Sequence, residues 1–393
     1  MTPLRSDGPT HPAMTHRGNI DPLTGFRFVA AMMVFFSHYA IPGLSGTALR
    51  MTLSGYAGVT LFFVLSGFVI AYNYLERFEA RMTVGNVGEY LAARFARVYP
   101  LYLGFIVLGW LVQGHPGIPW AHLLAIQTWS PDAELAFSLN GPAWSIGVEV
   151  FLYLAFLPLV PLVVRSGVLS SLRRLQMATA LVALAMVCAA AYFTWNGQNA
   201  LPPQDPASGH RWLYRMPATR LGDFLLGIFG AVYFMRFAKA DRASVRRWGY
   251  VTLLAAIMLL VFMAIPKNYR SAFSWDVAYA LPSIVAIIGL AINQQTLISR
   301  VLSSPALILL GEASYALYLV HVPVGPLRFG GAGGLAVEFA LYVIFVAMVI
   351  SLAIGLHIAI EKPARKWVRR WLAPGAKVAA MPQEADTIRP KIQ

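Results

Sequence analysis

The strongest constraint in this sequence is a series of long apolar stretches that recur from about residue 20 to residue 360. Stretches of roughly 17–25 apolar residues are typical of helices that cross a lipid bilayer. Hydrophobic residues make up 58% of the chain and charged residues 12%, against about 25% charged residues in a soluble domain. The sequence therefore predicts an all-α integral membrane protein. We count about ten transmembrane helices, at residues 22–42, 57–75, 98–113, 143–164, 176–194, 217–235, 250–266, 277–293, 308–326 and 336–360.

The distribution of basic residues predicts how these helices are oriented. If the N-terminus is cytoplasmic, 24 of the 31 Lys and Arg residues fall on the inner side and 7 on the outer side. Cytoplasmic connections of membrane proteins are enriched in Lys and Arg. We therefore expect both termini to be cytoplasmic. The net charge of +14 is then mostly a topology signal and requires no nucleic-acid partner.

The positions of these spans predict one membrane domain, residues 21–367, between two cytoplasmic tails. Residues 1–20 are polar, contain three prolines and lack a signal peptide, so we expect them to be disordered, like residues 368–393. Helically spaced apolar residues in 78–97 predict an amphipathic helix on the inner surface that leads into the third span. In the connection 114–142, which lacks Lys and Arg, we expect a short helix at the outer interface, placed to roof a cavity.

Ionisable side chains inside apolar spans are unfavourable in lipid, so each is a candidate for function. His38 lies in the first span, eleven residues after Arg27. That spacing is close to three helical turns, so both share one helix face, about 16 Å apart along the axis. If Arg27 marks the inner edge, His38 lies near the bilayer midplane, where an imidazole can exchange a proton near neutral pH. The alternatives are a packing role for His38 and a topology anchor for Arg27.

Two further sites follow the same reasoning. Arg94 and Arg97 lie three residues apart at the inner end of the third span, and paired guanidinium groups suit phosphates. Their alternative role is to extend from the apolar interface into water. Glu149 lies about 8 Å below the outer end of the fourth span, where a carboxylate needs a partner or a water-filled cavity. We expect it to meet His38, with a structural hydrogen bond between helices as the alternative.

The other ionisable residues favour structural roles. Arg220 and Asp223, at i and i+3 in the outer part of the sixth span, predict an ion pair. His321, near the outer end of the ninth span, is a weaker counterpart of His38, and His357 and Glu361 are expected at the inner interface. The single cysteine excludes an internal disulfide, and we find no metal-ligand spacing and no seryl-nucleophile motif.

Together, these residues resemble the membrane acyltransferase 3 family of bacterial sugar O-acyltransferases over about residues 21–367. Each motif is loose by itself, but their order on a ten-span frame is specific. In the first span, Arg27 and His38 are separated by ten residues, as in the opening helix of the family. The other matching segments are residues 58–59 and 63–68, the Arg-x-x-Arg element at 94–97, Trp144-Ser145 with Glu149, residues 220–227 and residues 314–321.

The resemblance implies a fold and an activity in the cytoplasmic (inner) membrane of a bacterium. An acyl group, usually acetyl, would pass from cytoplasmic acyl-CoA to a hydroxyl of a surface polysaccharide, lipid-linked glycan or secreted sugar-bearing metabolite, without a bound cofactor. Some members carry an SGNH-type domain after the last span, and with 33 residues after that span we expect a stand-alone member. Glu312 stands where the family suggests a small or basic residue, which weakens a donor-binding role there.

The resemblance also implies roles for individual residues. His38 would be catalytic together with Glu149, and the donor side would comprise Arg27, Arg94 and Arg97. We assign the acceptor side or a structural role to Trp144, Arg220, Asp223 and His321.

Several alternatives stay open. A secondary transporter of a glycosylated or acylated solute would be favoured by broken helices in two matched halves, and the sequence contains no such symmetry. The membrane-bound O-acyltransferase class also uses an intramembrane histidine, but its partner motifs are not evident. Within the acyltransferase hypothesis, His38 acts either as a general base or in a relay that carries the acyl group on His38 or on pantetheine.

Overall fold

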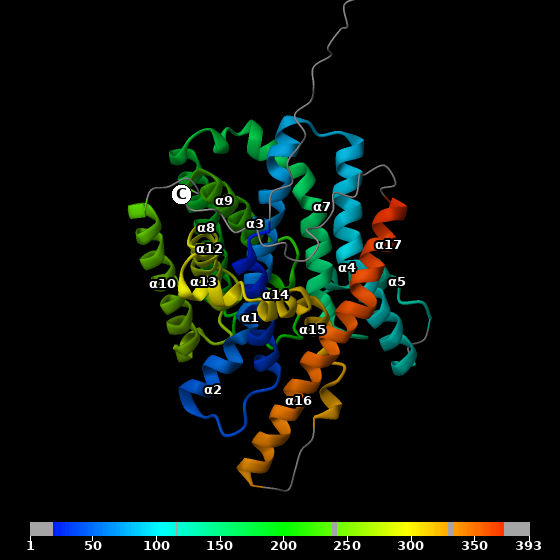
Figure 1. Ribbon diagram of the computed structural model, residues 1–393. Helices are drawn as coiled ribbons and strands as arrows, with labels where there is room; N and C mark the ends of the chain where they lie inside the picture. The colour runs from blue at the N-terminus through cyan, green and yellow to red at the C-terminus, as the bar shows by residue number, and fades with distance from the viewer. Residues whose placement is uncertain (1–18, 115–116, 238–241, 329–333, 373–393) are drawn as a thin grey trace, which may run out of the picture.

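The computed structural model describes residues 19–114, 117–237, 242–328 and 334–372. Within these ranges the regular secondary structure is entirely helical (Figure 1). The elements up to residue 195 are α1 (Asp21–His38), α2 (Gly46–Leu53), η1 (Ser54–Tyr56), α3 (Ala57–Ala80), α4 (Val84–Gln113), α5 (Trp120–Leu123), η2 (Gln127–Trp129), α6 (Ala133–Phe137), α7 (Ala143–Arg165), η3 (Val168–Ser170) and α8 (Leu172–Trp195).

The second half of the chain continues in the same way, with two π-helices, η4 and η7. Its elements are η4 (His210–Arg215), α9 (Leu221–Phe237), α10 (Arg242–Ala264), η5 (Pro266–Asn268), α11 (Ala272–Trp275), α12 (Val277–Ile292), α13 (Leu297–Leu302), α14 (Pro305–Glu312), α15 (Ser314–Val320), η6 (Gly325–Leu327), α16 (Leu335–Leu356), η7 (His357–Glu361) and α17 (Lys362–Leu372).

Most of the two predicted tails, residues 1–18 and 373–393, lies outside the described residues. The start of the C-terminal tail was predicted too early, because residues 368–372 belong to α17. α17 packs beside α4, and Val368 is only 9% exposed. Burial of an apolar side chain against α4 favours continuation of the helix beyond the predicted boundary.

The described residues contain seven helical stretches that are long and apolar enough to cross a membrane. The multi-pass helical architecture is therefore confirmed, whereas the predicted number of ten spans is not. The seven stretches are Gly46–Ala80, Val84–Gln113, Ala143–Arg165, Leu172–Trp195, Arg246–Ala264, Ala272–Ile292 and Leu335–Val368.

The three remaining predicted spans correspond to helices in the interior of the bundle. α1 has 18 residues and α9 has 17, while the predicted ninth span is broken at Ala313 into α14 and α15. α1 packs against α3 and α14, and α9 packs against α3 and α12. A helix surrounded by protein needs no continuous apolar surface, because neighbouring helices satisfy its polar groups. These helices therefore carry ionisable residues that a helix facing lipid would lack.

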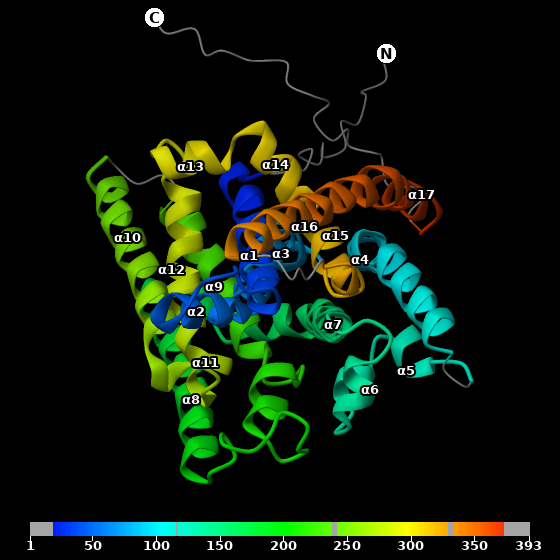
Figure 2. The same ribbon diagram turned by 90° about the horizontal axis from the view of Figure 1, so that it is seen from below.

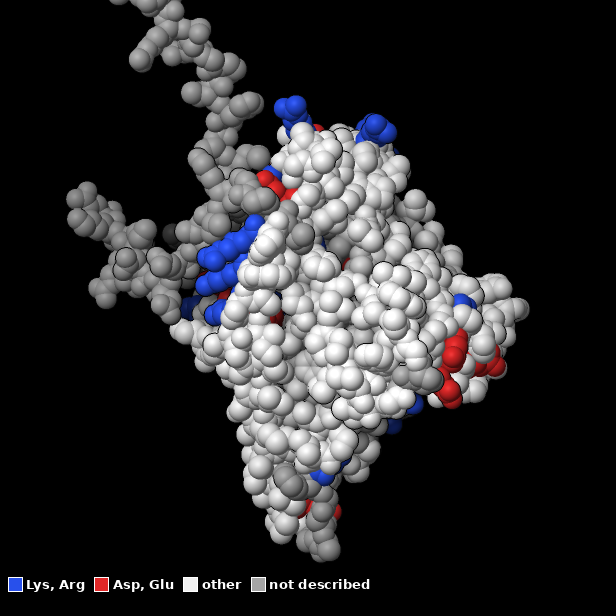
Figure 3. Space-filling view, turned by 90° about the vertical axis from the view of Figure 1, so that its right-hand side faces the viewer, with Lys and Arg blue, Asp and Glu red and all other residues white. Residues whose placement is uncertain are grey.

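The helices at the rim have the opposite character. Only 11% of the apolar stretch of α8 and 17% of that of α10 are buried inside the protein, against 78% for Ala272–Ile292. In Figure 1, α10 lies at one edge of the bundle, and α4 and α17 lie at the opposite edge. Figure 3 shows a face on which charged side chains are confined to the margins. A broad surface without charges suits contact with lipid.

The third span differs from its prediction. α4 is one helix of 30 residues, so residues 84–97 continue directly into the span and do not form a separate helix on the inner surface. Tyr90 and Ala96 are buried in the bundle, which ties this part of α4 to its neighbours. A helix of this length is about 45 Å long, or about 15 Å longer than the hydrocarbon core. The amphipathic pattern therefore reflects a helix that extends beyond the bilayer.

The connection between α4 and α7 contains α5, η2 and α6, which lie beside the ends of α4 and α7 in Figure 2. The predicted short helix is α5, and Trp120 on it is 62% exposed. His122 on the same helix is 2% exposed. A cavity of about 280 Å³ lies within this connection, lined by residues 118–122, Leu135, Ser138 and Leu139. All of its lining residues belong to the connection itself, so the expected roof over a cavity of the bundle stays a prediction.

α3 and α9 meet at a pair of glycines. A Cβ atom on Gly67 would lie 2.2 Å from the carbonyl oxygen of Phe224, and one on Gly227 would lie 2.1 Å from that of Val64. The two backbones are therefore in contact at this point. Small residues permit such close approaches between membrane helices.

We expect Gly67→Ala to lower the thermal unfolding temperature of the purified protein in detergent. The added methyl group meets backbone, which cannot rotate away, and overpacking of this kind costs about 1–3 kcal/mol. Gly88→Ala on α4 is the matched control, since no atom lies within 4 Å of its new Cβ. That variant should be neutral or slightly stabilising, because alanine favours helix. An unchanged unfolding temperature for Gly67→Ala would contradict the close packing.

Candidate active site

A pair of histidines marks the end of α1 that the charge distribution predicts to be outer. His38 is the last residue of α1, and its side chain is exposed. Its ring centroid lies 5.1 Å from that of His321, which directly follows α15. The two residues are far apart in sequence and meet because α1 packs against α15. The sequence predicted no contact between these two histidines, and the fold brings them together.

His321 is buried and held in one orientation. It is 1% exposed, and its Nδ1 lies 2.7 Å from the carbonyl oxygen of Tyr318. Tyr39 donates its hydroxyl to the carbonyl of His321 at 3.0 Å. Because a carbonyl oxygen only accepts hydrogen bonds, we assign the ring proton to Nδ1, which leaves a lone pair on Nε2. Nε2 has no hydrogen-bond partner within the described residues, so it is available to a group in the site.

Glu149 lies on α7 but does not meet His38 as expected. Its carboxylate accepts a hydrogen bond from Ser66 Oγ on α3 at 3.1 Å and another from the hydroxyl of Tyr153, one turn further along α7. Across the described chain, no hydrogen bond joins Glu149 to His38. The expected contact fails because the α7 face that carries Glu149 packs against α3, which supplies Ser66.

Tyr318 lies between Glu149 and the histidines. Its hydroxyl accepts a hydrogen bond from Ser145 Oγ at 2.8 Å, and the charge of Glu149 acts on it. Its ring centroid is 5.8 Å from that of His321. Tyr318, which was not singled out from the sequence, thus lies next to His321 and is near enough to Glu149 for the charge of Glu149 to act on it.

Arg94 and Arg97 lie on the other side of Glu149, and both are half-buried. The guanidinium carbon of Arg94 lies 5.9 Å from the ring centroid of Tyr153 and 5.6 Å from that of Tyr74. The charges of both arginines act on Tyr153. Arg94 thus faces the interior of the bundle, and Tyr153 connects the arginine pair to Glu149.

Arg27 is half-buried on α1, about 16 Å along the helix from His38. The geometry of α1 thus agrees with the shared face that the sequence predicts for these two residues. The described contacts assign Arg27 no partner of its own, so its donor role stays a prediction.

Aromatic side chains from four elements form what we call the aromatic wall, made of Tyr56, Trp144, His210, Tyr214 and Trp275. The ring centroid of Tyr214 lies 4.9 Å from that of Trp144, 5.2 Å from His210 and 5.8 Å from Tyr56. The rings of His210 and Trp275 are 5.5 Å apart. Only Trp144 was singled out from the sequence, because uncharged aromatic residues in connections carry no signal of their own.

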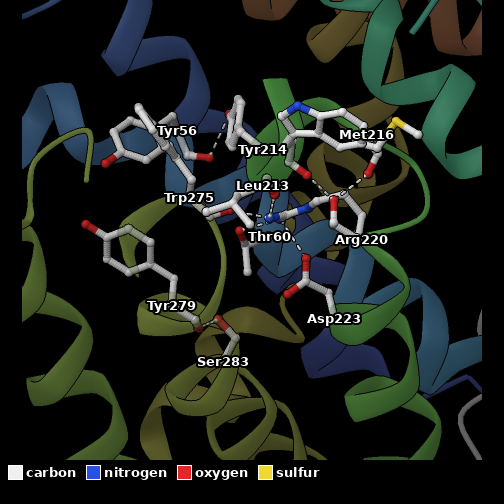
Figure 4. A network of polar contacts seen from close by, with 12 residues as sticks. Tyr56, Thr60, Leu213, Tyr214, Met216, Arg220, Asp223, Trp275, Tyr279 and Ser283 are labelled. Atoms are coloured by element: carbon white, nitrogen blue, oxygen red, sulfur yellow. Dashed lines mark hydrogen bonds and ion pairs between the residues drawn. The ribbon is translucent and has the colours of Figure 1, made fainter. Parts of the chain in front are cut away.

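The predicted ion pair of Arg220 and Asp223 lies next to the aromatic wall. Arg220 Nη2 is 2.7 Å from Asp223 Oδ2, and both side chains are 0% exposed. The guanidinium also donates to Thr60 Oγ1 at 2.7 Å, to the carbonyl of Leu213 at 3.3 Å and to the carbonyl of Trp275 (Figure 4). Arg220 therefore ties α9 to α3, η4 and α11, which supports a structural role.

A second ionic cluster lies at the predicted inner end of α16. His357 Nδ1 is 2.9 Å from Glu361 Oε2, and His357 Nε2 is 3.5 Å from Glu312 Oε2. Lys362 Nζ lies 3.5 Å from the same Glu312 oxygen. His357 and Glu361 are 0% and 2% exposed, so both are buried inside the protein, and their depth at the inner membrane interface stays a prediction. The π-helix η7 carries them into the bundle, and Glu312, to which the sequence assigned no such contact, is the ionic partner of His357 and Lys362.

Comparison with known proteins identifies relatives over most of the chain. The family model described as an acyltransferase domain matches residues 20–360. Acyltransferase MdmB of Streptomyces mycarofaciens is 30% identical over 94% of this chain and 97% of its own length. The O-acetyltransferase OatA of Staphylococcus aureus is 23% identical over 77% of this chain. The chain spans only half of that relative, 50% of its length. No solved structure shows a significant match.

We expect Arg220→Met to lower the unfolding temperature strongly. The substitution leaves Asp223 buried without its cation, and breaking a buried pair in this way costs about 3–5 kcal/mol. Arg236→Met is the control, because Arg236 lies on α9, which begins directly after Arg220, but is exposed and should change stability by only about 0.5 kcal/mol. Thermal unfolding in detergent compares the two, and similar unfolding temperatures would argue against the network as a structural tie.

Proposed function

Because this chain belongs to the membrane acyltransferase 3 family, we propose that it transfers an acyl group from acyl-CoA to a hydroxyl of a sugar or glycan. Its acyltransferase and O-acetyltransferase relatives support acyl transfer to a hydroxyl. The observation that carries the proposal is the row of side chains that leads from Arg94 through Tyr153 and Glu149 to Tyr318 and the histidine pair at His38. This row joins an anion-binding group to a proton-accepting group.

On the donor side, Arg94 and Arg97 bind the phosphates of acyl-CoA, most simply acetyl-CoA, with Arg27 as a further cation. Guanidinium groups hold phosphate oxygens in a bidentate fashion, and half-burial strengthens the attraction by reducing screening. The pantetheine arm then extends past Tyr153 and Glu149 toward His38. The acyl-CoA is a substrate, and the scheme needs no bound cofactor.

On the acceptor side, His38 acts as the general base. It takes the proton of the acceptor hydroxyl while the hydroxyl oxygen attacks the thioester carbonyl, and the proton then passes to the departing thiolate. In this scheme the lone pair on His321 Nε2, which is unpaired among the described residues, becomes the acceptor for the N–H of His38 during the reaction. That bond leaves the other ring nitrogen of His38 unprotonated and ready to act as a base. His321 is therefore a positioning residue in this scheme.

Glu149 does not contact the reacting atoms in this scheme and acts by positioning its neighbours. Its hydrogen bonds with Ser66 and Tyr153 position the tyrosine between the arginine pair and the histidine pair. A relay in which His38 or pantetheine carries the acyl group would use the same residues. Incubation with radiolabelled acetyl-CoA without acceptor tests for the relay through His38, because only that route leaves label on the protein.

We place this reaction in the cytoplasmic membrane of a bacterium, with the lipid bilayer, acyl-CoA and the sugar acceptor as partners and no nucleic acid. The arginine pair lies on the cytoplasmic side of the bundle and the histidine pair on the outer side, so the two substrates arrive from opposite faces. The rival function is a secondary transporter of a glycosylated or acylated solute. The break between α14 and α15 at Ala313 is a feature that transporters share, but a transporter would release no thiol from acyl-CoA.

Replacement of the proposed base tests the function directly. We expect His38→Ala to lower transfer of acetyl from acetyl-CoA by about 10²–10⁴-fold, the usual contribution of a general base. The unfolding temperature should hold, because the His38 side chain is exposed. Ser37→Ala is the control and should keep near wild-type turnover, since Ser37 bonds only to the carbonyl of Val34 in its own helix. Thiol release and mass spectrometry of the cell's glycans measure the result, and full activity in His38→Ala would refute the base assignment.

The donor assignment predicts a different kinetic effect. Arg94→Ala and Arg97→Ala should each raise the KM for acetyl-CoA by about 10- to 100-fold, because a hydrogen bond to a charged group contributes about 1.5–3 kcal/mol. Lysine should restore only part of the loss, since an ammonium lacks the guanidinium fork. Arg81→Ala, which removes an exposed arginine from the same predicted side, should leave the KM unchanged. Equal effects on the KM of donor and acceptor would count against phosphate binding.

A further inference from the structure

Arg270, in the connection between α10 and α12, has an unusual backbone conformation. Its φ is 53°, and within the described residues only Ala125 and Leu139 share a positive φ among the non-glycine residues. Such a conformation is unfavourable for a long side chain. The Arg270 N–H donates to the Tyr56 hydroxyl at 3.0 Å, and that hydroxyl donates to Ser274 Oγ at 2.7 Å. The surrounding structure therefore holds Arg270 in a strained position, a pattern that often marks ligand-binding sites.

The Arg270 side chain lies beside the aromatic wall. It is exposed, and its guanidinium carbon lies 5.3 Å from the ring centroid of Tyr269. The ring of Tyr269 is in turn 6.3 Å from that of Tyr56 in the wall. The positive charge of Arg270 acts on His38, and it also acts on His210 in the wall. One guanidinium thus contacts a tyrosine next to the wall and is near enough for its charge to act on the proposed base.

No carboxylate partner was found for Arg270 within the described part of the chain. The acids nearest to the wall, Asp223 and Asp276, are 0% and 2% exposed, and the charge of Arg220 acts on both. Burial, helped by Arg215 and Arg270, lowers the pKa of His210 to about 3, so His210 is uncharged near neutral pH. The exposed side chains on the predicted outer side therefore include this fixed positive charge. The exposed carboxylates of that side, Asp132, Glu134 and Glu338, belong to α6 with its N-cap and to α16, and none forms an ion pair with Arg270 among the described residues.

This charge pattern bears on the class of acceptor. The hydroxyl groups of a neutral sugar can all donate hydrogen bonds, and exposed carboxylates are the strongest acceptors for them. Among the described residues no carboxylate pairs with His38 or Arg270, and the Arg270 guanidinium pairs well with a carboxylate or a phosphate. Complementary charge is a source of specificity in binding.

We propose that the acceptor is an anionic sugar and that Arg270 binds its carboxylate or phosphate while a hydroxyl of the same molecule reaches His38. The aromatic wall then packs against the apolar face of the sugar ring. This inference rests on the proposed function and adds to it the chemical class of the acceptor. Arg270 is in this scheme a specificity residue, because it touches the substrate away from the reacting atoms.

Equilibrium binding to the purified full-length protein tests the inference. The probes are methyl glucoside, which is neutral, its glucuronic acid counterpart, and glucose 1-phosphate, titrated by calorimetry in the presence of acetyl-CoA. We expect one or both anions to bind at least about 10-fold more tightly than the glucoside, since a charged hydrogen bond contributes about 1.5–3 kcal/mol. The stronger of the two identifies the group as carboxylate or phosphate. Equal binding of all three probes, or no binding of either anion, would overturn the inference.

Variants at the same connection separate charge from fold. Arg270→Asn removes the charge and keeps a residue that tolerates positive φ, so it should fold and lose the preference for the anion. Arg270→Lys should keep part of that preference. Lys267→Asn is the control, because Lys267 is an exposed cation in the same connection and should leave the preference intact. If Arg270→Asn retained the preference, or if Lys267→Asn abolished it equally, the assignment to Arg270 would be wrong.

Failure of the inference is distinguishable from failure of the proposed function. The function is tested by thiol release from acetyl-CoA with glycans and metabolites extracted from the cell as acceptors. Release that depends on His38 but does not change in Arg270→Asn would leave the acyltransferase function in place and refute the anionic acceptor. Absence of any release dependent on His38 would refute the function itself.

Discussion

The buried ion pair of Arg220 and Asp223 is the interaction on which the predicted outer half of the structure depends. Arg220 reaches the backbone of η4 and α11 and the Thr60 hydroxyl on α3, and η4 and α11 carry Tyr214 and Trp275 of the aromatic wall. Within a bilayer no water is available to replace these bonds. The position of the wall is therefore coupled to a single guanidinium whose partners are all within the protein.

The same constraint explains how the helices are distributed. Polar side chains are stable within the membrane only where other side chains surround them, and α9 and α15, whose Asp223 and Ser314 are 0% exposed, lie in the interior. The apolar stretches of α8 and α10 are mostly exposed and lie at the rim. The interior position of α1 and α15 in turn brings His38 to His321, while Ser66 of α3 meets Glu149. Because polar groups are excluded from lipid, the candidate catalytic groups gather in the row that leads from Arg94 to the histidine pair.

That row has a chemical consequence for the proposed reaction. Arginines suited to phosphates lie toward one end and histidines suited to proton transfer toward the other, with tyrosines between them. An acyl donor with phosphates at one end and a thioester at the other matches this arrangement. Arg270 adds a positive charge beyond the histidines, on the side from which we propose that the acceptor enters.

The sequence by itself determined the helical membrane class, most of the long spans, the Arg220–Asp223 pair and the candidates His38, Arg94 and Arg97, because hydropathy, helical spacing and charge are local properties. Only the tertiary structure decided which candidates meet. His38 pairs with His321, Glu149 binds Ser66 and Tyr153, and Glu312 becomes the partner of His357. These contacts depend on which helix faces pack together and where a span breaks, as at Ala313, and such packing is a non-local property of the whole bundle that residue spacing does not encode.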